Sequence, residues 1–314
     1  MKEITGIVLS AGFGTRLRPF TEDLPKPLVP LLDKTPIWHQ IMILKKYGVK
    51  KIYVNLHYFP EMIDNYIERN FKDISTIYEP KILGTGGGIS NIVRKFNIDT
   101  PIIVLNGDTV SNVDLEKMVD FHLEKGSDAT MLLKKNRNIL DENSVFVDKQ
   151  NRIIAVKRRP SETDSAYFKC SFLGVHILNP ALFDYLPNEG CINKLAYPMF
   201  IENNFKIYGF ITRRESFDIG TIENLYFSNM GFLGSEITSP VFTKRYIAQR
   251  RDNNNNIIGE NVFLSDSTIR NSIICSNCKI IGSVIEDSII FSDTNIENVH
   301  IKRGLANSKY RYII

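Results

Sequence analysis

Segments with the residue pattern of β-strands alternate with segments that have the pattern of α-helices along the first 134 residues of this chain. In chain order they are Ile4–Ser10, Ile37–Tyr47, Lys51–Leu56, Glu61–Phe71, Ile74–Tyr78, Gly88–Phe96, Pro101–Asn106, Leu115–Lys125 and Ala129–Lys134. Such alternation predicts βαβ units, in which helices cover both faces of a mainly parallel sheet. In these sheets, ligands bind beyond the carboxyl ends of the strands. We therefore expect an α/β fold with its ligand site at that edge.

The pattern changes to shorter expected strands from residue 144 onward. We expect strands at Ser144–Asp148, Arg152–Arg158, Tyr167–Leu178 and Lys206–Thr212, and helices at Pro180–Tyr185, Lys194–Asn203 and Ile222–Phe232. This arrangement predicts a substrate-facing extension of the same sheet. The run Asp252–Asn256 contains no apolar residue and indicates a loop or linker.

A 16-residue repeat follows this run. Aligning Val262–Asn277 with Cys278–Asp293 superposes Leu264 on Ile280, Ile269 on Ile285 and Ile274 on Ile290, and the register continues to Ile296 and Ile301. Apolar spacings of five, five and six residues are typical of short strands stacked as a solenoid. The repeat resembles a short left-handed β-helix of hexapeptide type, and a β-meander is the alternative. We predict domains at 1–235 and 257–314, joined by a linker at 236–256.

Composition excludes several classes of protein. With 43% hydrophobic residues over 314 positions, the chain can bury a large core. The net charge of +4 is spread along the chain and falls short of a nucleic-acid footprint. No apolar run approaches the roughly 18 residues of a membrane span, and Met1 leads directly into the first strand, so we expect a cytoplasmic protein. Four cysteines, with one isolated C-x-x-C, are expected to be free thiols rather than zinc ligands: Cys170, Cys191, Cys275 and Cys278.

The first expected strand runs directly into Ala11–Pro19, a loop with two glycines. These glycines allow a sharp turn that brings backbone amides close to an anion, while Arg16, Arg18 and Lys26 place cations within reach. The loop lacks the third glycine of the dinucleotide fingerprint and the Gly-Lys-Ser/Thr of the P-loop. An ordinary strand-to-helix turn is the alternative. The cations favour a site for the phosphates of a nucleotide.

This loop and Pro25–Pro30 together resemble the signature of the sugar-1-phosphate nucleotidylyltransferases. Asn106–Asp108 and Asp218–Thr221 match two further family segments, so the resemblance covers roughly residues 4–232. It implies a three-layer Rossmann-like nucleotidyltransferase domain as the catalytic domain. It also implies transfer of a nucleotidyl group from a nucleoside triphosphate to a sugar 1-phosphate, with release of pyrophosphate.

Nucleotidyl transfer requires little covalent chemistry from a protein, so positioning and electrostatics must supply most of the rate. We assign Arg16 to the β- and γ-phosphates, because a planar guanidinium bridges two oxygens. Lys26, between two prolines, is assigned to the α-phosphate and the incoming sugar phosphate. With Asp108 they are the expected catalytic residues. Asp108 and Asp218 are the expected Mg²⁺ ligands, with helix capping by Asp218 or Thr221 as the alternative.

The expected nucleotide-binding residues lie in two Gly-rich segments, since Leu83–Gly87 matches the family segment that lies against the nucleobase. They are Leu9, Ala11, Gly12, Gly14, Thr15, Arg16, Glu79, Gly84 and Thr85. The residues expected to bind the sugar phosphate are Lys26, Asn106, Arg159 and Gly174. Without the resemblance, Glu79–Gly88 indicates a flexible loop.

Two segments depart from the family pattern. Arg158–Pro160 replaces Glu-Lys-Pro, so Arg159 can keep the phosphate contact while Arg158 cannot accept hydrogen bonds from the sugar. Cys170–Gly174 lacks the usual asparagine. The most similar patterns are those of mannose-1-phosphate guanylyltransferases, heptose-phosphate guanylyltransferases and the uridylyltransferase for N-acetylmuramic acid 1-phosphate. GTP with mannose 1-phosphate or a heptose 1-phosphate is favoured, and UTP with an amino-sugar or glucose 1-phosphate is the alternative.

Two other classes of function stay open at this point. One is a non-catalytic regulatory subunit that binds a sugar nucleotide, and the other is a cytidylyltransferase for a small alcohol phosphate. A purely regulatory subunit has no need of Arg16, Lys26, Asp108 and Asp218 together. The exposed ends of the solenoid predict a homo-oligomer. No nucleic-acid or membrane partner is expected.

Overall fold

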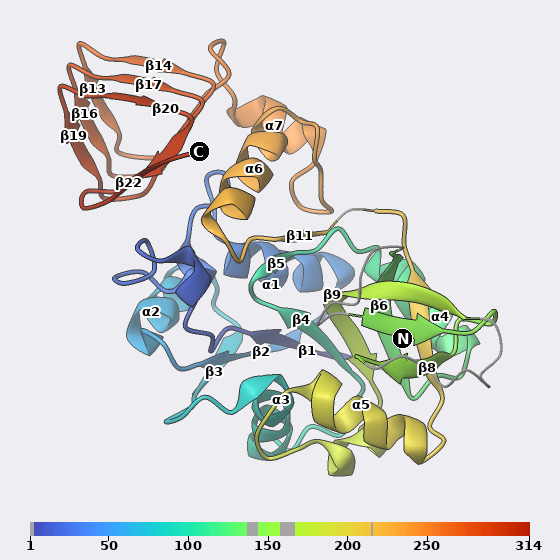
Figure 1. The fold of residues 1–314 in the computed structure, drawn as a ribbon. Coiled ribbons are helices and arrows are strands. Elements are labelled where there is room, and N and C mark those ends of the chain that lie inside the picture. Colours follow the sequence, from blue (N-terminus) through green and yellow to red (C-terminus); the bar gives the residue numbers. More distant parts are fainter. Residues whose placement is uncertain (1–2, 137–143, 158–166, 215) are drawn as a thin grey trace. The chain divides into compact units, whose positions relative to one another are not determined.

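The computed structural model describes residues 3–136, 144–157, 167–214 and 216–314 (Figure 1). The chain forms two compact units, each built from two separate stretches of sequence. The first unit combines Met1–Gly12 with Gln40–Ser216, and the second combines Phe13–His39 with Phe217–Ile314. Most of the predicted phosphate loop, Ala11–Pro19, therefore belongs to the same unit as the C-terminal part of the chain.

A central β-sheet organises the first unit, and in the described residues it has nine strands. They are β1 (Thr5–Leu9), β2 (Lys51–Leu56), β3 (Ile74–Tyr78), β4 (Ile102–Asn106), β6 (Ala129–Lys135), β7 (Ser144–Val147), β8 (Ile153–Val156), β9 (Phe168–Leu178) and β10 (Ile207–Ile211). The strand order is β10-β6-β9-β4-β1-β2-β3, and β7 pairs with β8 and β9. The strands β3, β2, β1 and β4 are mutually parallel, as are β6 and β10, while β9 runs antiparallel to β4 and β6. The predicted α/β class with a mainly parallel sheet is confirmed.

Helices cover this sheet and bury its central strands. They are α1 (Pro36–Tyr47), which begins in the second unit, α2 (Pro60–Asn70), α3 (Gly84–Lys95), α4 (Leu115–Glu124), the 3-10 helix η3 (Pro180–Tyr185) and α5 (Ile192–Glu202); the short strand β5 is Thr109–Val110. On one face, Ile102 and Val104 of β4 share a buried cluster with Ile92 of α3 and Tyr197 of α5. Figure 1 shows α3 and α5 side by side on that face. Because β4 is buried on both faces, its sequence is a continuous apolar run.

The second unit combines short turns near its beginning with two helices and a strand-rich C-terminal part. Its first elements are η1 (Thr15–Leu17), η2 (Lys26–Leu28), β11 (Phe217–Asp218), α6 (Ile222–Leu233) and α7 (Lys244–Arg250). Thr221 caps α6 by accepting a hydrogen bond from Asn224 N at 3.2 Å, and Thr243 caps α7 through Tyr246 N at 3.2 Å. The α7 helix lies in the stretch expected to be a linker. The predicted domain boundaries themselves stay a prediction.

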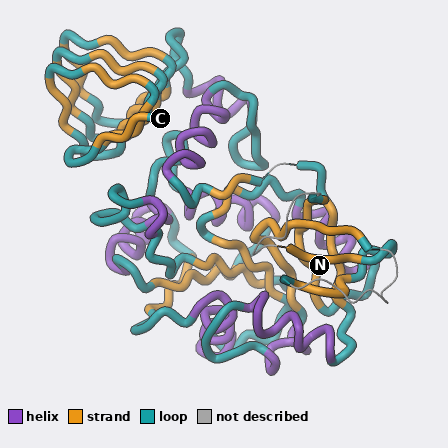
Figure 2. The backbone as a smooth tube through the Cα atoms, in the orientation of Figure 1, coloured by secondary structure: helices purple, strands orange, loops and turns teal. Residues whose placement is uncertain are grey.

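Beyond α7 the chain forms a β-helix, in which short parallel strands stack coil upon coil (Figure 2). Its strands are β12 (Ile257–Ile258), β13 (Phe263–Ser265), β14 (Thr268–Arg270), β15 (Ile273–Ile274), β16 (Lys279–Ile281), β17 (Val284–Glu286), β18 (Ile289–Ile290), β19 (Asn295–Glu297), β20 (His300–Lys302), β21 (Gly304–Ala306) and β22 (Arg311–Ile313). Leu264 pairs with Ile280, Ile269 with Ile285 and Ile274 with Ile290, so the predicted 16-residue register is confirmed. The last strand, β22, pairs antiparallel with β21.

Short polar side chains make the corners of this β-helix. Asn255, Asn271 and Asp287 have φ values of 61°, 45° and 48° and recur every 16 residues. Asn and Asp tolerate this left-handed conformation better than other side chains. They also join the coils, since Asn271 Nδ2 donates to Asp287 Oδ1 at 2.6 Å. Asparagine and aspartate at this position of the repeat are therefore turn residues.

The structure also bears on membrane insertion. Within the described part of the chain, no helix combines the length and the apolar character that a membrane crossing requires.

Candidate functional site

A buried polar network joins the carboxyl ends of three parallel strands in the first unit. Ser10 N, after β1, donates to Asn55 Oδ1 at 2.8 Å, and Asn55 Nδ2 donates to Glu79 Oε1 at 2.8 Å. The second carboxylate oxygen of Glu79 accepts from Leu83 N at 3.2 Å, just before α3. Glu79 is fully buried. Its carboxylate therefore holds the strand ends and the start of α3 in register, a role that sequence reasoning missed.

Helix α3 begins at Gly84, earlier than the Gly88 predicted from the sequence. A string of glycines has low helix propensity, which is why the sequence indicated a loop here. The structure compensates by packing against the turn that precedes α5. Gly86 N donates to Gly190 O at 2.8 Å, and Thr85 Oγ1 accepts from Ile192 N at 3.0 Å. Tertiary contacts override local propensity in this segment.

The segment after β4 brings two predicted sugar-phosphate residues together. Gly107 N donates to Leu9 O at 2.8 Å, which holds this segment against the end of β1. Gly174 of β9 lies so close that an added Cβ would be 3.3 Å from Asn106 Nδ2 and 3.1 Å from Thr109 Oγ1. Asp108 is half-buried, and its Oδ1 accepts from Thr109 Oγ1 at 3.4 Å. Asn106 and Gly174 are thus neighbours at the predicted edge of the sheet.

In the second unit, the turn that carries Arg16 packs against the turn that carries Lys26. Gly14 has a φ of 66°, and a Cβ added there would be 2.8 Å from Lys26 Cβ, so only glycine permits this approach. Thr21 Oγ1 donates to Gly14 O at 2.9 Å and closes the first turn. Lys26 is only 6% exposed, whereas 60% of the Arg16 side chain is exposed. The two predicted phosphate-binding cations therefore lie on adjoining turns.

Asp218 lies beside Arg16 in the same unit. Arg16 NH1 is 3.6 Å from Asp218 Oδ2, while Asp218 Oδ1 accepts a hydrogen bond from Gly220 N at 2.8 Å. A Cβ on Gly220 would be 2.5 Å from Arg16 NH2, so this glycine leaves room for the guanidinium. Since Thr221 caps α6, the capping role considered for Asp218 falls to its neighbour.

The remaining predicted residues divide between the units. Leu9, Ala11 and Gly12 belong to the first unit with Asp108, and Thr15 belongs to the second with Asp218. Arg159 and its neighbours at 158–160 lie outside the described residues.

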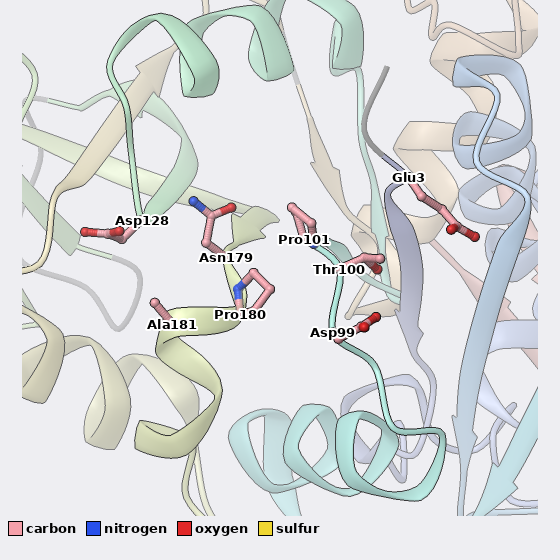
Figure 3. Close-up of a pocket in the computed structure, with 8 residues that line it drawn as sticks. All are labelled: Glu3, Asp99, Thr100, Pro101, Asp128, Asn179, Pro180 and Ala181. Atoms are coloured by element: carbon pink, nitrogen blue, oxygen red, sulfur yellow. The ribbon is translucent and has the colours of Figure 1, made fainter.

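A pocket of about 510 Å³ lies at the opposite edge of the sheet in the first unit (Figure 3). Its lining comes from segments next to strand ends: Glu3, Asp99, Thr100, Pro101, Asp128, Asn179, Pro180 and Ala181. Thr100 and Pro101 precede β4 and Asp128 precedes β6, so this pocket faces the amino ends of those parallel strands. None of the residues predicted to bind substrate lines it.

The two most deeply buried histidines are structural. His176 Nδ1 lies 2.9 Å from Tyr197 Oη in the first unit, and His39 Nε2 lies 2.8 Å from Ser239 Oγ in the second. Burial lowers the pKa of each histidine to about 3, so both are neutral near pH 7. All four cysteines are free thiols. Burial raises the pKa of Cys170 to about 11, which makes it a poor nucleophile.

Comparison with known proteins agrees with this geometry. A sequence profile for nucleotidyl transferases matches residues 5–233. The chain is 33% identical over 221 residues to D-glycero-alpha-D-manno-heptose 1-phosphate guanylyltransferase from Aneurinibacillus thermoaerophilus, with 68% of this chain and 92% of that protein covered. It is 32% identical to mannose-1-phosphate guanyltransferase from Debaryomyces hansenii, with 68% and 60% covered.

Other relatives differ in their named substrates or in length. The chain is 28% identical to UTP–glucose-1-phosphate uridylyltransferase from Synechocystis, with 74% of this chain and 64% of that protein covered. The chain thus spans less than two thirds of the longer relatives. HddC from Yersinia pseudotuberculosis, solved in complex with GMP-PN, has a TM-score of 0.60 and 25% identity, with 74% of this chain and 100% of HddC covered. The profile match, the sheet and the paired cation-bearing turns together establish that this chain belongs to the nucleotidyl transferase family.

Proposed function

We propose that this chain transfers a nucleotidyl group from a nucleoside triphosphate to a sugar 1-phosphate, with GTP and mannose 1-phosphate or a heptose 1-phosphate as the favoured pair. The observation that carries the proposal is the pair of adjoining turns in the second unit, which carry Arg16 and Lys26 and pack closely where Gly14 meets Lys26. Arg16 NH1 also lies 3.6 Å from Asp218 Oδ2. This arrangement suits a polyphosphate that carries a cation. The named activities of the similar guanylyltransferases support GTP.

In the proposed reaction, a phosphate oxygen of the sugar 1-phosphate attacks the α-phosphorus of the triphosphate. A P–O bond forms there, while the bond between the α-phosphorus and the oxygen bridging to the β-phosphate breaks. The electron pair of that bond leaves with pyrophosphate. Because the attacking oxygen is already ionised near pH 7, the step requires no protein base.

Arg16 and Lys26 have different proposed tasks that follow from their burial. The exposed guanidinium of Arg16 would bridge oxygens of the β- and γ-phosphates and stabilise the charge that develops on the leaving group. Lys26 follows Pro25 and precedes Pro27, and its burial restricts its freedom. A compact ammonium held in this way would orient the α-phosphate against the sugar phosphate.

We propose Mg²⁺ as the metal, with Asp108 and Asp218 as its protein ligands. Members of the family generally use a divalent metal ion. Carboxylate oxygens suit a hard cation, and Mg²⁺ typically takes one or two of them and completes its shell with phosphate oxygens and water. The described residues contain no cluster of three or more potential metal ligands. When bound, the ion would neutralise phosphate charge.

The other substrate contacts stay as the sequence predicts them. We propose that the nucleotide is bound by Leu9, Ala11, Gly12, Gly14, Thr15, Arg16, Glu79, Gly84 and Thr85, and the sugar phosphate by Lys26, Asn106, Arg159 and Gly174. The closeness of Gly174 to Asn106 supports a shared role for these two. For Glu79 we propose a contact through the main chain, because both of its carboxylate oxygens already accept hydrogen bonds, from Asn55 Nδ2 and from Leu83 N.

UTP is the second candidate nucleotide. The similarity to the uridylyltransferase from Synechocystis favours it, with glucose 1-phosphate or an amino-sugar 1-phosphate as acceptor. A non-catalytic regulatory subunit remains the alternative from another class. The retention of Arg16, Lys26, Asp108 and Asp218 argues for catalysis.

A pyrophosphate-release screen tests the proposal. The purified protein is incubated with each of GTP, UTP, ATP and CTP against mannose, glucose, heptose and amino-sugar 1-phosphates, with and without Mg²⁺. We expect turnover with GTP and one of the favoured sugars, and its loss on omission of Mg²⁺. If no combination of nucleotide and sugar 1-phosphate is turned over, the proposal that this chain is an enzyme is refuted. Turnover with UTP alone would favour UTP as the nucleotide substrate.

The metal assignment has its own matched pair of variants. Asp108→Asn removes one proposed ligand charge, so we expect turnover to fall below detection while the protein stays folded. Asp99→Asn, an exposed carboxylate in the opposite pocket, serves as the control and should retain full activity. Activity retained in Asp108→Asn would remove this residue from the metal site.

We also propose that the chain forms a homo-oligomer through the open end of the β-helix. Leu264 in the first coil aligns with the fully buried Ile280 of the next coil, yet it is 39% exposed because none of the residues that the structure describes forms a coil over it. Phe263 beside it is 56% exposed. Apolar side chains next to the unpaired edge of β13 would be covered by a second copy.

A further inference from the structure

The segment Phe13–His39, which carries Arg16 and Lys26, packs against aromatic residues of the β-helix part of the same unit. The Phe20 ring stacks on Phe291 with a centroid distance of 4.8 Å and an interplanar angle of 26°. Tyr310 meets the same Phe20 ring edge-on, at 6.4 Å and 82°. Phe20 is 1% exposed and Phe291 is 3% exposed. The residues that follow the phosphate loop therefore pack, through Phe20, against Phe291 and Tyr310 from the C-terminal part of the chain.

Polar contacts lock the residues that follow Phe20. Tyr310 Oη donates to Glu22 Oε2 at 2.7 Å, and Lys309 Nζ lies 2.7 Å from Asp23 Oδ2. The turn between β21 and β22 presents both donors. Asn307 Oδ1 organises that turn by accepting hydrogen bonds from Lys309 N at 2.9 Å and Tyr310 N at 2.7 Å. The C-terminal hairpin thus holds the loop at defined points.

The segment is also anchored on the other side of Lys26. Leu32 N donates to Asn229 Oδ1 at 2.7 Å, and Asn229 Nδ2 donates to Pro30 O at 3.0 Å, so α6 fixes the backbone there. Cys275 Sγ lies 4.0 Å from Leu32 O. Cys275 and Phe291 are 16 residues apart, so these two contacts come from one position repeated in successive coils.

A short series of contacts links the aromatic cluster of Phe20, Phe291 and Tyr310 to the turn that carries Arg16, a proposed phosphate-binding residue. Phe20 precedes Thr21, whose Oγ1 donates to Gly14 O at 2.9 Å and closes the turn that carries Arg16. Thr15 and Arg16 are exposed, whereas Leu17 and Phe20 beneath them are buried. The geometry of the exposed residues consequently depends on the buried residues that support them.

We propose that Phe291 and Tyr310 are positioning residues of the β-helix that hold the phosphate loop in its reactive geometry. This inference rests on the proposed function of Arg16 and Lys26. Displacing a catalytic group by about 1 Å can lower a rate by about 100-fold, so support of the loop from below has catalytic consequences. The β-helix is then a part of the active-site scaffold.

Steady-state kinetics of full-length variants test this inference. We expect Phe291→Ala to lower kcat about 10- to 100-fold, because Phe20 loses its stacked neighbour. Phe291→Leu keeps most of the buried volume and should recover activity to within about fivefold of wild type. Tyr310→Phe keeps the ring but loses the hydrogen bond to Glu22, and should lower kcat about threefold. The effects should follow kcat more than the KM for the acceptor sugar.

Ile285→Ala is the matched control. Ile285 is fully buried in the β-helix core, in a cluster that contains no residue of the phosphate loop. It should weaken the β-helix while leaving kcat of the folded enzyme within about twofold of wild type. Equal losses in Phe291→Ala and Ile285→Ala would mean that general loosening of the β-helix is the cause, and would overturn the inference. Tyr310→Phe carries the test if Phe291→Ala does not fold.

Hydrogen exchange provides a readout that does not depend on the reaction. Amides of residues 13–28 should exchange about tenfold faster in Phe291→Ala than in wild type, and at the wild-type rate in Ile285→Ala. Wild-type enzyme that turns over no substrate pair would refute the proposed function, while the exchange data would still decide whether Phe291 restrains the loop. Unchanged exchange in Phe291→Ala would overturn the inference.

Discussion

Gly220 offers a way to move Arg16 and its partner Asp218 without unfolding the protein. A Cβ at this position would be 2.5 Å from Arg16 NH2, where carbon contacts below 3.0 Å are essentially never seen, so the guanidinium must move by at least about 0.5 Å. The same Cβ would be 2.7 Å from Asp218 Oδ1, so both partners of the ion pair must move, and each group is the far end of a flexible side chain. We therefore expect Gly220→Ala to fold normally and to reposition Arg16, which is assigned to the β- and γ-phosphates, together with the Asp218 carboxylate.

The magnitude follows from two separate contributions. The ion pair between Arg16 and Asp218 is exposed, with 60% and 49% of the side chains accessible, so its loss should change the unfolding free energy by less than about 1 kcal/mol. A hydrogen bond from a charged group to phosphate contributes about 1.5–3 kcal/mol. Losing it should lower kcat/KM roughly 10- to 100-fold.

The assay pairs pyrophosphate-release kinetics with a urea melt of the same preparations. Gly234→Ala is the matched control, because a Cβ there is no closer than 3.4 Å to any neighbour. Wild-type kcat/KM in a folded Gly220→Ala variant would refute the reasoning, because Arg16 would then not need its observed position. A urea midpoint of Gly220→Ala far below that of wild type would refute the assumption that only flexible side chains must move.

Three further predictions concern stability and assembly. Glu79→Gln places an amide donor against the donors of Asn55 and Leu83, so a urea melt should show a loss of about 1–3 kcal/mol. Burial lowers the pKa of His176 and His39 from the ordinary 6.5 to about 3 in the folded state. Their contribution to the unfolding free energy is therefore fully present above pH 6.5 and decreases as the pH falls below it. Each histidine should lower the unfolding free energy by about 2 kcal/mol at pH 5 relative to pH 7. Urea midpoints that do not change between these two pH values would contradict this. Leu264→Glu should lower the mass measured by light scattering, whereas an unchanged mass would count against assembly through the open coil.

The strand pairing of the β-helix was predictable in detail because each strand pairs with the strand one repeat further along the chain. Each coil contacts the next at the same 16-residue interval, so the apolar pattern alone specifies that Ile280 lies between Leu264 and Ile296. The strands of the sheet were predictable for a similar reason, since buried parallel strands are short apolar runs between helices. The β2 and β3 boundaries agree with the sequence prediction residue for residue.

Other features depended on contacts that the sequence does not reveal. The start of α3 was predicted too late, because its glycines are stabilised by the turn at 187–190 rather than by local propensity. The α7 helix was missed in a stretch that lacks strong periodicity. The buried network of Glu79 was missed because its hydrogen-bond partner Asn55 belongs to another strand, and the sequence alone does not reveal that contact.

The chain's own residues determined the α/β class, the repeat and the family, because each rests on a local pattern or a contiguous motif. Only the tertiary structure decided what supports the phosphate loop. Phe20 and Phe291 are separated by most of the chain, and nothing in the spacing of either residue indicates the other. Burial of two distant aromatic rings against each other is a property of the folded chain, and it assigns to the β-helix a part in holding Arg16 and Lys26.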